Sequence, residues 1–249
     1  MLQEITLESE YVITDHGTSD GTQVKYFKDR HWYKLDRYGG EGEAEEVASD
    51  ILTLSGFPKK KFVTYQQILI NGQKGCVSKN FLKPDEQFVT FYRLFFNMKG
   101  RDLATVTSRM DYDDAIEFVL SFVRDATGLD VREYLANTFT LDALILNEDR
   151  HFNNMGIIFD GEAFREAPIF DNGKSFFIGN PKYKPEKPFA KNRAKAFAKA
   201  FSGSFDLNRK YLQDYATLRI KKGQILRYVD EHPDLADNIK GALLQQINQ

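Results

Sequence analysis

The sequence lacks several features that would place it in a familiar class of protein. Among its 249 residues it holds a single cysteine, Cys76, so an intrachain disulfide and a zinc site of four thiolates are both excluded. Its formal net charge is only −2, which excludes a uniformly basic nucleic-acid coat and an acidic disordered tail. No stretch approaches the 18 apolar residues of a membrane-spanning helix, and the acidic start has no signal-peptide pattern. The sequence therefore predicts a soluble cytoplasmic protein.

The first eighty residues carry patterns typical of a small antiparallel sheet with one helix. Two aromatic-rich runs surround a polar turn within residues 24–36, and two further runs at 61–70 and 75–82 flank Asn71-Gly72. Both patterns predict β-hairpins. Between them, residues 41–55 carry apolar side chains at helical spacing, which predicts a helix packed on the sheet.

From residue 85 onward the spacing of apolar residues is mainly helical. A helix capped by Asp111 is expected to reach Asp125, and a capping-box pattern at 130–133 is expected to open a helix that runs to about Leu146. A second hairpin is predicted around Asp160-Gly161. Further helices are expected at 187–202, 206–216, 220–231 and 235–247. The change of pattern places a boundary near residues 81–85.

A polar loop that follows the helix expected to end at about Leu146 holds the candidate catalytic residues. Asp149 and Asn154 are five residues apart, and Asp171 follows 22 residues after Asp149, beyond the hairpin. Phosphoryl transfer needs one carboxylate that positions a hydroxyl and accepts its proton, and further oxygens that hold Mg²⁺ on the phosphates. Mg²⁺ keeps several waters, so one Asp and one Asn suffice. Each residue alone is more typical of a cap or turn, but the ordered set predicts one phosphate-handling cleft.

Two segments around these residues resemble a known family. They are Asn-Glu-Asp-Arg-His-Phe-Asn-Asn-Met-Gly at 147–156 and Pro-Ile-Phe-Asp-Asn-Gly-Lys-Ser at 168–175. They resemble the HipA-like serine/threonine kinases, bacterial members of the protein-kinase-like fold, several of which act as toxins. The spacing of Asp149 and Asn154 equals that of the protein-kinase catalytic loop. The chain resembles the compact branch of this family, which lacks the extra amino-terminal subdomain.

The resemblance implies a fold and a catalytic set. The expected fold is α+β and two-lobed, protein-kinase-like, with a small β-rich N-lobe and one helix at 1–80 and a larger α-helical C-lobe at 81–249. Asp149 is implied as the catalytic aspartate, and Asn154 and Asp171 as the ligands of Mg²⁺.

The resemblance also implies an ATP site in the first lobe. Lys34 is the expected partner of the α- and β-phosphates, and its ion-pair partner is expected to be Glu45 or Glu46, with Glu43 as the third option. The remaining implied contacts are Gly17, Thr18, Ser19 and Gly21 for the phosphates and the backbone of Lys79, Asn80 and Phe81 for adenine. By itself the loop at 15–22 is as typical of an ordinary turn. The hydroxyls of Thr18, Ser19 and Thr22 are candidate autophosphorylation sites, where added negative charge would inhibit ATP binding.

Several residues near the two loops keep alternative interpretations. Arg150 either binds an activating phosphate or pairs with a local carboxylate. Asp142 either supports the catalytic loop or lies on the surface. His151 is expected to orient the loop rather than bind metal, because no second histidine stands nearby. Cys76 is expected to pack in a core.

Residues 182–222 carry an excess of positive charge. They hold nine lysines and three arginines against three acidic residues, a net charge of +9. Lysines recur every four residues at 187, 191, 195 and 199, which predicts one basic stripe on the expected helix, with Phe189, Phe197 and Phe201 on another face. We interpret the stripe as a solvated face; the alternative is a docking surface for an acidic partner or RNA.

The expected activity is transfer of the γ-phosphate of ATP, with Mg²⁺, to a serine or threonine of a protein. The resemblance implies a protein substrate, in some relatives a translation-related one, and an antitoxin or partner subunit. Neither membrane association nor direct nucleic-acid binding is expected. The expected location is the bacterial cytoplasm, with secretion by a signal-independent route left open. Two alternatives are a phosphoinositide-type lipid kinase, because those enzymes also carry Asp-Arg-His-x-x-Asn, and a non-catalytic pseudokinase.

Overall fold

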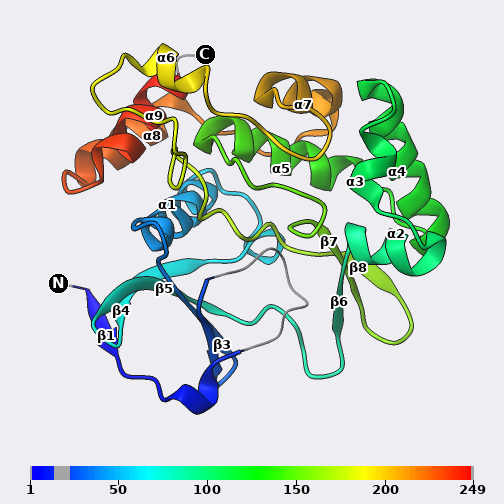
Figure 1. The fold of residues 1–249 in the computed structure, drawn as a ribbon, viewed down its shortest axis with the longest axis horizontal. Coiled ribbons are helices and arrows are strands. Elements are labelled where there is room, and N and C mark those ends of the chain that lie inside the picture. The colour runs from blue at the N-terminus through cyan, green and yellow to red at the C-terminus, as the bar shows by residue number, and fades with distance from the viewer. Residues whose placement is uncertain (1, 14–22, 248–249) are drawn as a thin grey trace.

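The computed structural model describes residues 2–13 and 23–247. Their amino-terminal part forms a five-stranded sheet in the order β1 (Gln3–Ile5), β4 (Tyr65–Ile70), β5 (Gln73–Lys79), β3 (His31–Leu35) and β2 (Lys25–Lys28). Neighbouring strands are antiparallel except for β1 and β4. A single helix, α1 (Glu41–Leu54), packs against β4 and β5 (Figure 1). The two hairpins and the helix predicted here are confirmed.

The pairing of β2, β3 and β5 decides which side chains face the rest of the protein. Lys25 pairs with Lys34, and Lys34 pairs with Cys76. Side chains that are directly opposite in an antiparallel pair lie on the same face, so these three share one face of the sheet. The neighbouring pair, Tyr26 with Tyr33, belongs to a separate apolar cluster on the other face. Cys76 is buried, as predicted.

The turn between β4 and β5 explains the register in which these two strands pair. Asn71 and Gly72 have φ angles of +51° and +77°, the left-handed conformations that a tight hairpin turn requires and that Asn and Gly tolerate best. The Asn71 side chain also accepts a hydrogen bond from the Leu7 N–H at 2.8 Å. The same turn therefore ties the amino-terminal segment to the sheet.

The larger part of the chain is mainly helical and surrounds α5 (Arg132–Ile145). Most side chains of α5 are buried, and α7 and α9 contact it (Figure 1). The α-helices around it are α2 (Phe91–Lys99), α3 (Leu103–Thr107), α4 (Tyr112–Thr127), α6 (Phe189–Arg193), α7 (Phe205–Leu212), α8 (Lys222–Glu231) and α9 (Asp237–Gln246). Short 3₁₀ turns stand at Ser9–Tyr11, Lys59–Lys61 and Gln213–Tyr215. No helix of the described ranges is both long and apolar enough to cross a bilayer.

A second, three-stranded sheet lies at the edge of the helical part. Its order is β6 (Gln87–Thr90), β7 (Gly156–Phe159) and β8 (Phe164–Glu166), all antiparallel. The predicted hairpin at Asp160-Gly161 joins β7 and β8, with both Glu162 and Ala163 donating backbone hydrogen bonds to Asp160 Oδ1. The expectation that residues 85 onward are helical is wrong for β6, because pairing with β7 holds this segment extended.

Two predictions about helix ends are also wrong. The capping box at 130–133 is absent: Val131 is the residue before α5 and makes no side-chain cap. Asp130 instead accepts hydrogen bonds from the backbone and the guanidinium of Arg132. The helix expected at 187–202 is reduced to α6, which ends at Arg193, so the basic stripe at 187, 191, 195 and 199 and the aromatic face do not form. A left-handed Ala200, with φ +75°, stands inside the segment that was expected to be helical.

Candidate active site

The polar loop at 147–154 begins where α5 ends. Leu146 terminates the helix in a left-handed conformation, and Asn147 then joins two parts of the loop. Its Nδ2 donates to Asp142 Oδ1 at 3.1 Å, and its Oδ1 accepts from the Asp149 N–H at 2.9 Å. Asn154 Nδ2 donates to the Asp149 carbonyl oxygen at 2.9 Å. The last bond fixes which end of the Asn154 amide is available as an oxygen ligand.

Arg150 connects this loop to the loop that carries Asp171. Its guanidinium is buried and contacts Asp142 Oδ2 at 3.0 Å. It also donates to the Phe170 carbonyl at 2.5 Å and to Asn172 Oδ1 at 2.6 Å. These two contacts lie on either side of Asp171. Of the two alternatives for Arg150, pairing with a local carboxylate is the one observed, and the buried Asp142 supports the polar loop at 147–154 rather than lying on the surface.

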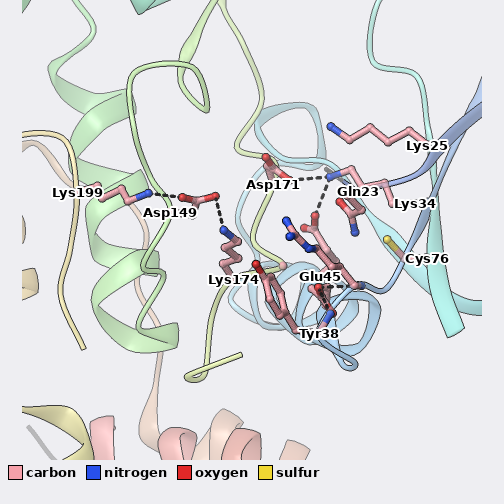
Figure 2. Close-up of a pocket in the computed structure, with 13 residues that line it drawn as sticks. Gln23, Lys25, Lys34, Tyr38, Glu45, Cys76, Asp149, Asp171, Lys174 and Lys199 are labelled. Atoms are coloured by element: carbon pink, nitrogen blue, oxygen red, sulfur yellow. Dashed lines mark hydrogen bonds and ion pairs between the residues drawn. The ribbon is translucent and has the colours of Figure 1, made fainter. Parts of the chain in front are cut away.

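Lys34 contacts carboxylates from both parts of the fold. Its Nζ lies 3.0 Å from Glu45 Oε1 on α1 and 2.8 Å from Asp171 Oδ1 (Figure 2). The other oxygen of Glu45 accepts a hydrogen bond from the Asn172 backbone N–H at 2.8 Å. The strand, the helix and the loop of Asp171 are therefore held together by one charged cluster.

Among the three acidic residues considered as partners of Lys34, Glu45 is the one that the described residues bring to it. Glu43 Oε1 accepts a hydrogen bond from the Ala236 backbone N–H at 2.9 Å. Glu46 is half-buried and bonds the backbone of Gln67. The helical periodicity of α1 thus directs Glu45 toward Lys34 and the other two carboxylates elsewhere.

The charged cluster shifts the pKa values of its members. Burial alone would lower the pKa of Lys34, but Asp171 and Glu45 raise it well above its usual range. Burial alone would raise the pKa of Asp171, but Lys34 and Lys25 hold it well below its usual range. Burial raises the pKa of Glu45, and Lys34 opposes this shift only in part. A cationic Lys34 and an anionic Asp171 are therefore the stable forms at neutral pH.

Two neighbouring cavities share Lys34 and Asp171 in their walls. The smaller has a volume of about 130 Å³ and also contacts Asp149, Lys174 and Lys199. The larger, of about 430 Å³, also contacts Asn154 and residues 78–82. The latter volume lies in the range of small-molecule pockets. Of the three residues predicted from the sequence as one set, Asp149 borders the smaller cavity, Asn154 borders the larger and Asp171 borders both.

An aromatic cluster forms one wall of the larger cavity. The ring of Phe81 lies 5.6 Å from that of Phe88 and 5.7 Å from that of Phe170, between ring centres. Such a wall suits a flat aromatic base. The Asn80 backbone N–H donates to the Arg30 carbonyl at 2.8 Å, so a base bound here would have to use other backbone groups of the segment 79–81.

Three lysines of the site were not predicted from the sequence to belong to it, although Lys199 was noted as part of the basic stripe. Lys25 lines both cavities beside Lys34, and burial lowers its pKa. The register of the first hairpin was the signal that could have found it. Lys174 Nζ lies 3.7 Å from Asp149 Oδ2, and Lys199 Nζ lies 2.5 Å from Asp149 Oδ1 (Figure 2). Lys174 follows the loop of Asp171 directly, whereas no local pattern links Lys199 to Asp149.

The predicted Gly17, Thr18, Ser19, Gly21 and Thr22 lie outside the described residues.

The donor set is suited to Mg²⁺ bound together with a phosphate ligand. Asp171 offers a carboxylate and Asn154 an amide oxygen, both in the wall of the larger cavity. Within the described ranges, no group of three or more His, Cys, Asp or Glu side chains could hold a metal ion. A cation at Asp171 and Asn154 would therefore need further oxygens from phosphate and water, which is the usual coordination of Mg²⁺ at nucleotides.

The sequence matches no protein-family model and no curated protein. The fold is similar to that of the Helicobacter pylori proinflammatory kinase CtkA, with a TM-score of 0.67 and 16% identity over 100% of this chain and 93% of that chain. A second solved structure is the Shewanella oneidensis toxin–antitoxin HipA in complex with HipB and operator DNA, with a TM-score of 0.41, 13% identity and coverage of 97% and 57%. The first similarity confirms the predicted fold class: this chain has an α+β fold with a β-rich amino-terminal part and a helical carboxy-terminal part, similar to the fold of a solved kinase.

Proposed function

We propose that this protein is a Mg²⁺- and ATP-dependent kinase that phosphorylates serine or threonine residues of a protein. The observation that carries the proposal is the Lys34 contact to both Glu45 and Asp171. Lys34 and Asp171 lie in the walls of two cavities, one of which also contacts Asp149 and the other Asn154. These groups are what phosphoryl transfer to a hydroxyl requires, and the fold is that of a solved kinase.

The two cavities suggest how ATP would lie. The adenine base fits the aromatic wall at Phe81, and the phosphates would then face Lys34 and Lys25, whose ammonium groups border both cavities. Asp171 and Asn154 would hold Mg²⁺, which neutralises charge on the phosphates. The dividing line between the two lobes falls, in this proposal, near residue 80, where β5 leads into the segment that contacts the base.

Asp149 is the residue proposed to act on the acceptor. Its carboxylate borders the smaller cavity, next to the place where the terminal phosphate would lie. There it can accept a hydrogen bond from a serine or threonine hydroxyl, orient the oxygen toward the phosphorus and take up the proton. The hydrogen bond that the Asn154 side-chain amide donates to the Asp149 backbone carbonyl keeps this aspartate and the Mg²⁺ ligand in a fixed relation.

A phosphoryl-transfer assay with the Asp149→Asn variant tests the proposal. Protein is incubated with γ-labelled ATP, Mg²⁺ and a cell lysate, and phosphosites on the lysate and on the protein itself are mapped by mass spectrometry. We expect phosphoserine or phosphothreonine, including Thr18, Ser19 or Thr22 if autophosphorylation occurs, and a loss of at least ~10²-fold in rate for Asp149→Asn. Mg²⁺-ATP affinity should stay within about threefold, since Asp149 is not a proposed metal ligand.

Two results would contradict the proposal. Label that enters phosphoinositide vesicles instead of protein would indicate a lipid kinase. A variant that phosphorylates protein as fast as the wild type would remove Asp149 from the mechanism.

A further inference from the structure

The segment from Phe197 to Gly203 is held against the catalytic loop. The Phe197 backbone N–H donates to Glu148 Oε1 at 3.1 Å, directly before Asp149 in the chain. The Ala198 N–H donates to the Gly203 carbonyl at 2.9 Å. The buried Asn208 of α7 donates to the Lys199 carbonyl at 3.1 Å. These bonds connect the backbone around residue 199 to the loop on one side and to a helix on the other. They therefore fix the position of the Lys199 backbone relative to Asp149.

The side chain of Lys199 reaches from this segment into the site. Its Nζ lies 2.5 Å from Asp149 Oδ1, while Lys174 lies 3.7 Å from the other oxygen of Asp149 (Figure 2). Lys199 borders the same small cavity as Lys34 and Asp171. Lys199 therefore lies beside the carboxylate that would receive the proton and beside the space that would receive the terminal phosphate.

The catalytic loop itself has no lysine or arginine that could reach the space proposed for the terminal phosphate. Arg150 is the one arginine of residues 147–154, which contain no lysine. Its guanidinium is buried against Asp142 and the backbone of the Asp171 loop, so it cannot also serve a phosphate in the cavity. A cation that stabilises the transferring group from the acceptor side must come from outside the loop, and Lys199 makes the closest contact to Asp149 among the described residues.

We propose that Lys199 is a further catalytic residue, whose ammonium group donates hydrogen bonds to the γ-phosphoryl group during transfer; this inference rests on the proposed function. In the step, the acceptor oxygen forms a bond to Pγ while the bond from Pγ to the bridging oxygen of ADP breaks and its electron pair leaves with ADP. The acceptor proton passes to Asp149. As that carboxylate loses its charge, Lys199 loses its ionic partner and its hydrogen bonds become available to the phosphoryl oxygens, where charge is concentrated.

The test measures ADP release and Mg²⁺-ATP binding for wild type, Lys199→Met, Lys199→Arg and Lys195→Ala. ADP release counts transfer to every acceptor, water included, so the assay needs no identified substrate. We expect Lys199→Met to lower kcat by about 10²-fold, the loss typical of one hydrogen-bond donor to a transition state, with Mg²⁺-ATP affinity within about threefold. Lys199→Arg, which keeps the charge, should restore part of kcat. Lys195 is exposed and lies two residues before this segment, so Lys195→Ala should match the wild type.

The opposite outcomes overturn the inference. Unchanged kcat in Lys199→Met would mean that the ion pair with Asp149 has no part in transfer, and raised kcat would mean that Lys199 blocks Asp149 in an autoinhibitory contact. Since the side chain is 37% exposed, the variant is expected to fold; circular dichroism checks this, and Lys199→Gln replaces Lys199→Met if its spectrum differs. Wild-type protein that neither binds Mg²⁺-ATP nor releases ADP would contradict the proposed function as well, which separates the two failures.

Discussion

Glu45 joins the sheet to the loop of Asp171 through one carboxylate. Its Oε1 lies 3.0 Å from Lys34 Nζ, and its Oε2 accepts the Asn172 backbone N–H at 2.8 Å. Movement of α1 would therefore disturb both the lysine proposed to bind phosphates and the loop proposed to bind Mg²⁺. The relationship makes α1 the element through which the two sides of the site depend on each other.

The first prediction concerns this shared carboxylate. Glu45→Gln removes a charge partner of Lys34 and should lower the free energy of unfolding by about 1.5–3 kcal/mol, the range for a hydrogen bond to a charged group. It should also raise the Kd for Mg²⁺-ATP, because Lys34 and the Asn172 loop lose their common anchor. Urea denaturation and calorimetry measure the two effects. The matched control is Glu46→Gln on the same helix, since Glu46 bonds Gln67 instead of Lys34; equal effects in both variants would refute the specific role of Glu45.

The second prediction concerns the buried pair of Asp142 and Arg150. Asp142→Asn leaves the Arg150 guanidinium buried without its counter-charge, and such losses lower the free energy of unfolding by about 3–5 kcal/mol. Denaturant unfolding measures it. The control is Lys61→Ala, which breaks the partly exposed pair with Glu133 at 2.6 Å and should lower stability by no more than about 1 kcal/mol. Similar losses in the two variants would show that Arg150 does not organise the site.

The third prediction concerns pH. Lys34 and Lys25 hold the folded-state pKa of Asp171 below its usual value, against an unfolded value near ~4. The stabilisation from this carboxylate is therefore complete above about pH 4 and is lost as the pH falls toward the folded-state pKa. Urea unfolding of wild type and Asp171→Asn between pH 3 and pH 8 should show a stability difference that is constant at neutral pH and shrinks below about pH 4. A difference that grows in acid would reverse the assignment.

The hairpins, α1 and most long helices could be predicted because their signals are local. Turn residues such as Asn71-Gly72 determine register, and amphipathic periodicity identifies one buried face. Asp149, Asn154 and Asp171 could be proposed as a set in the same way, because their loops are short and each follows a recognisable element. The partner of Lys34 could not be chosen from the sequence, because the pattern does not show which of the neighbouring glutamates of α1 faces the sheet.

The segment at 187–202 shows where local signals fail. Its alanines and lysines have high helix propensity, yet the helix ends at Arg193 and the chain continues as turns and irregular structure. There Ala196 and Ala198 are both buried, and Phe201 packs on Phe139 and Phe152. Tertiary contacts of this kind outweigh propensity. They also bring Lys199 to Asp149, fifty residues earlier in the chain, and no sequence spacing predicts that contact.

The central claim is that Asp171 and Asn154 hold a Mg²⁺-bound triphosphate beside Asp149. Calorimetric titration of ATP, with and without Mg²⁺, into wild type, Asp171→Asn and Asp149→Asn tests it most directly. We predict that Mg²⁺ tightens ATP binding to the wild type and to Asp149→Asn, and that Asp171→Asn loses this gain. Binding of Mg²⁺-ATP to Asp171→Asn with wild-type affinity would contradict the account.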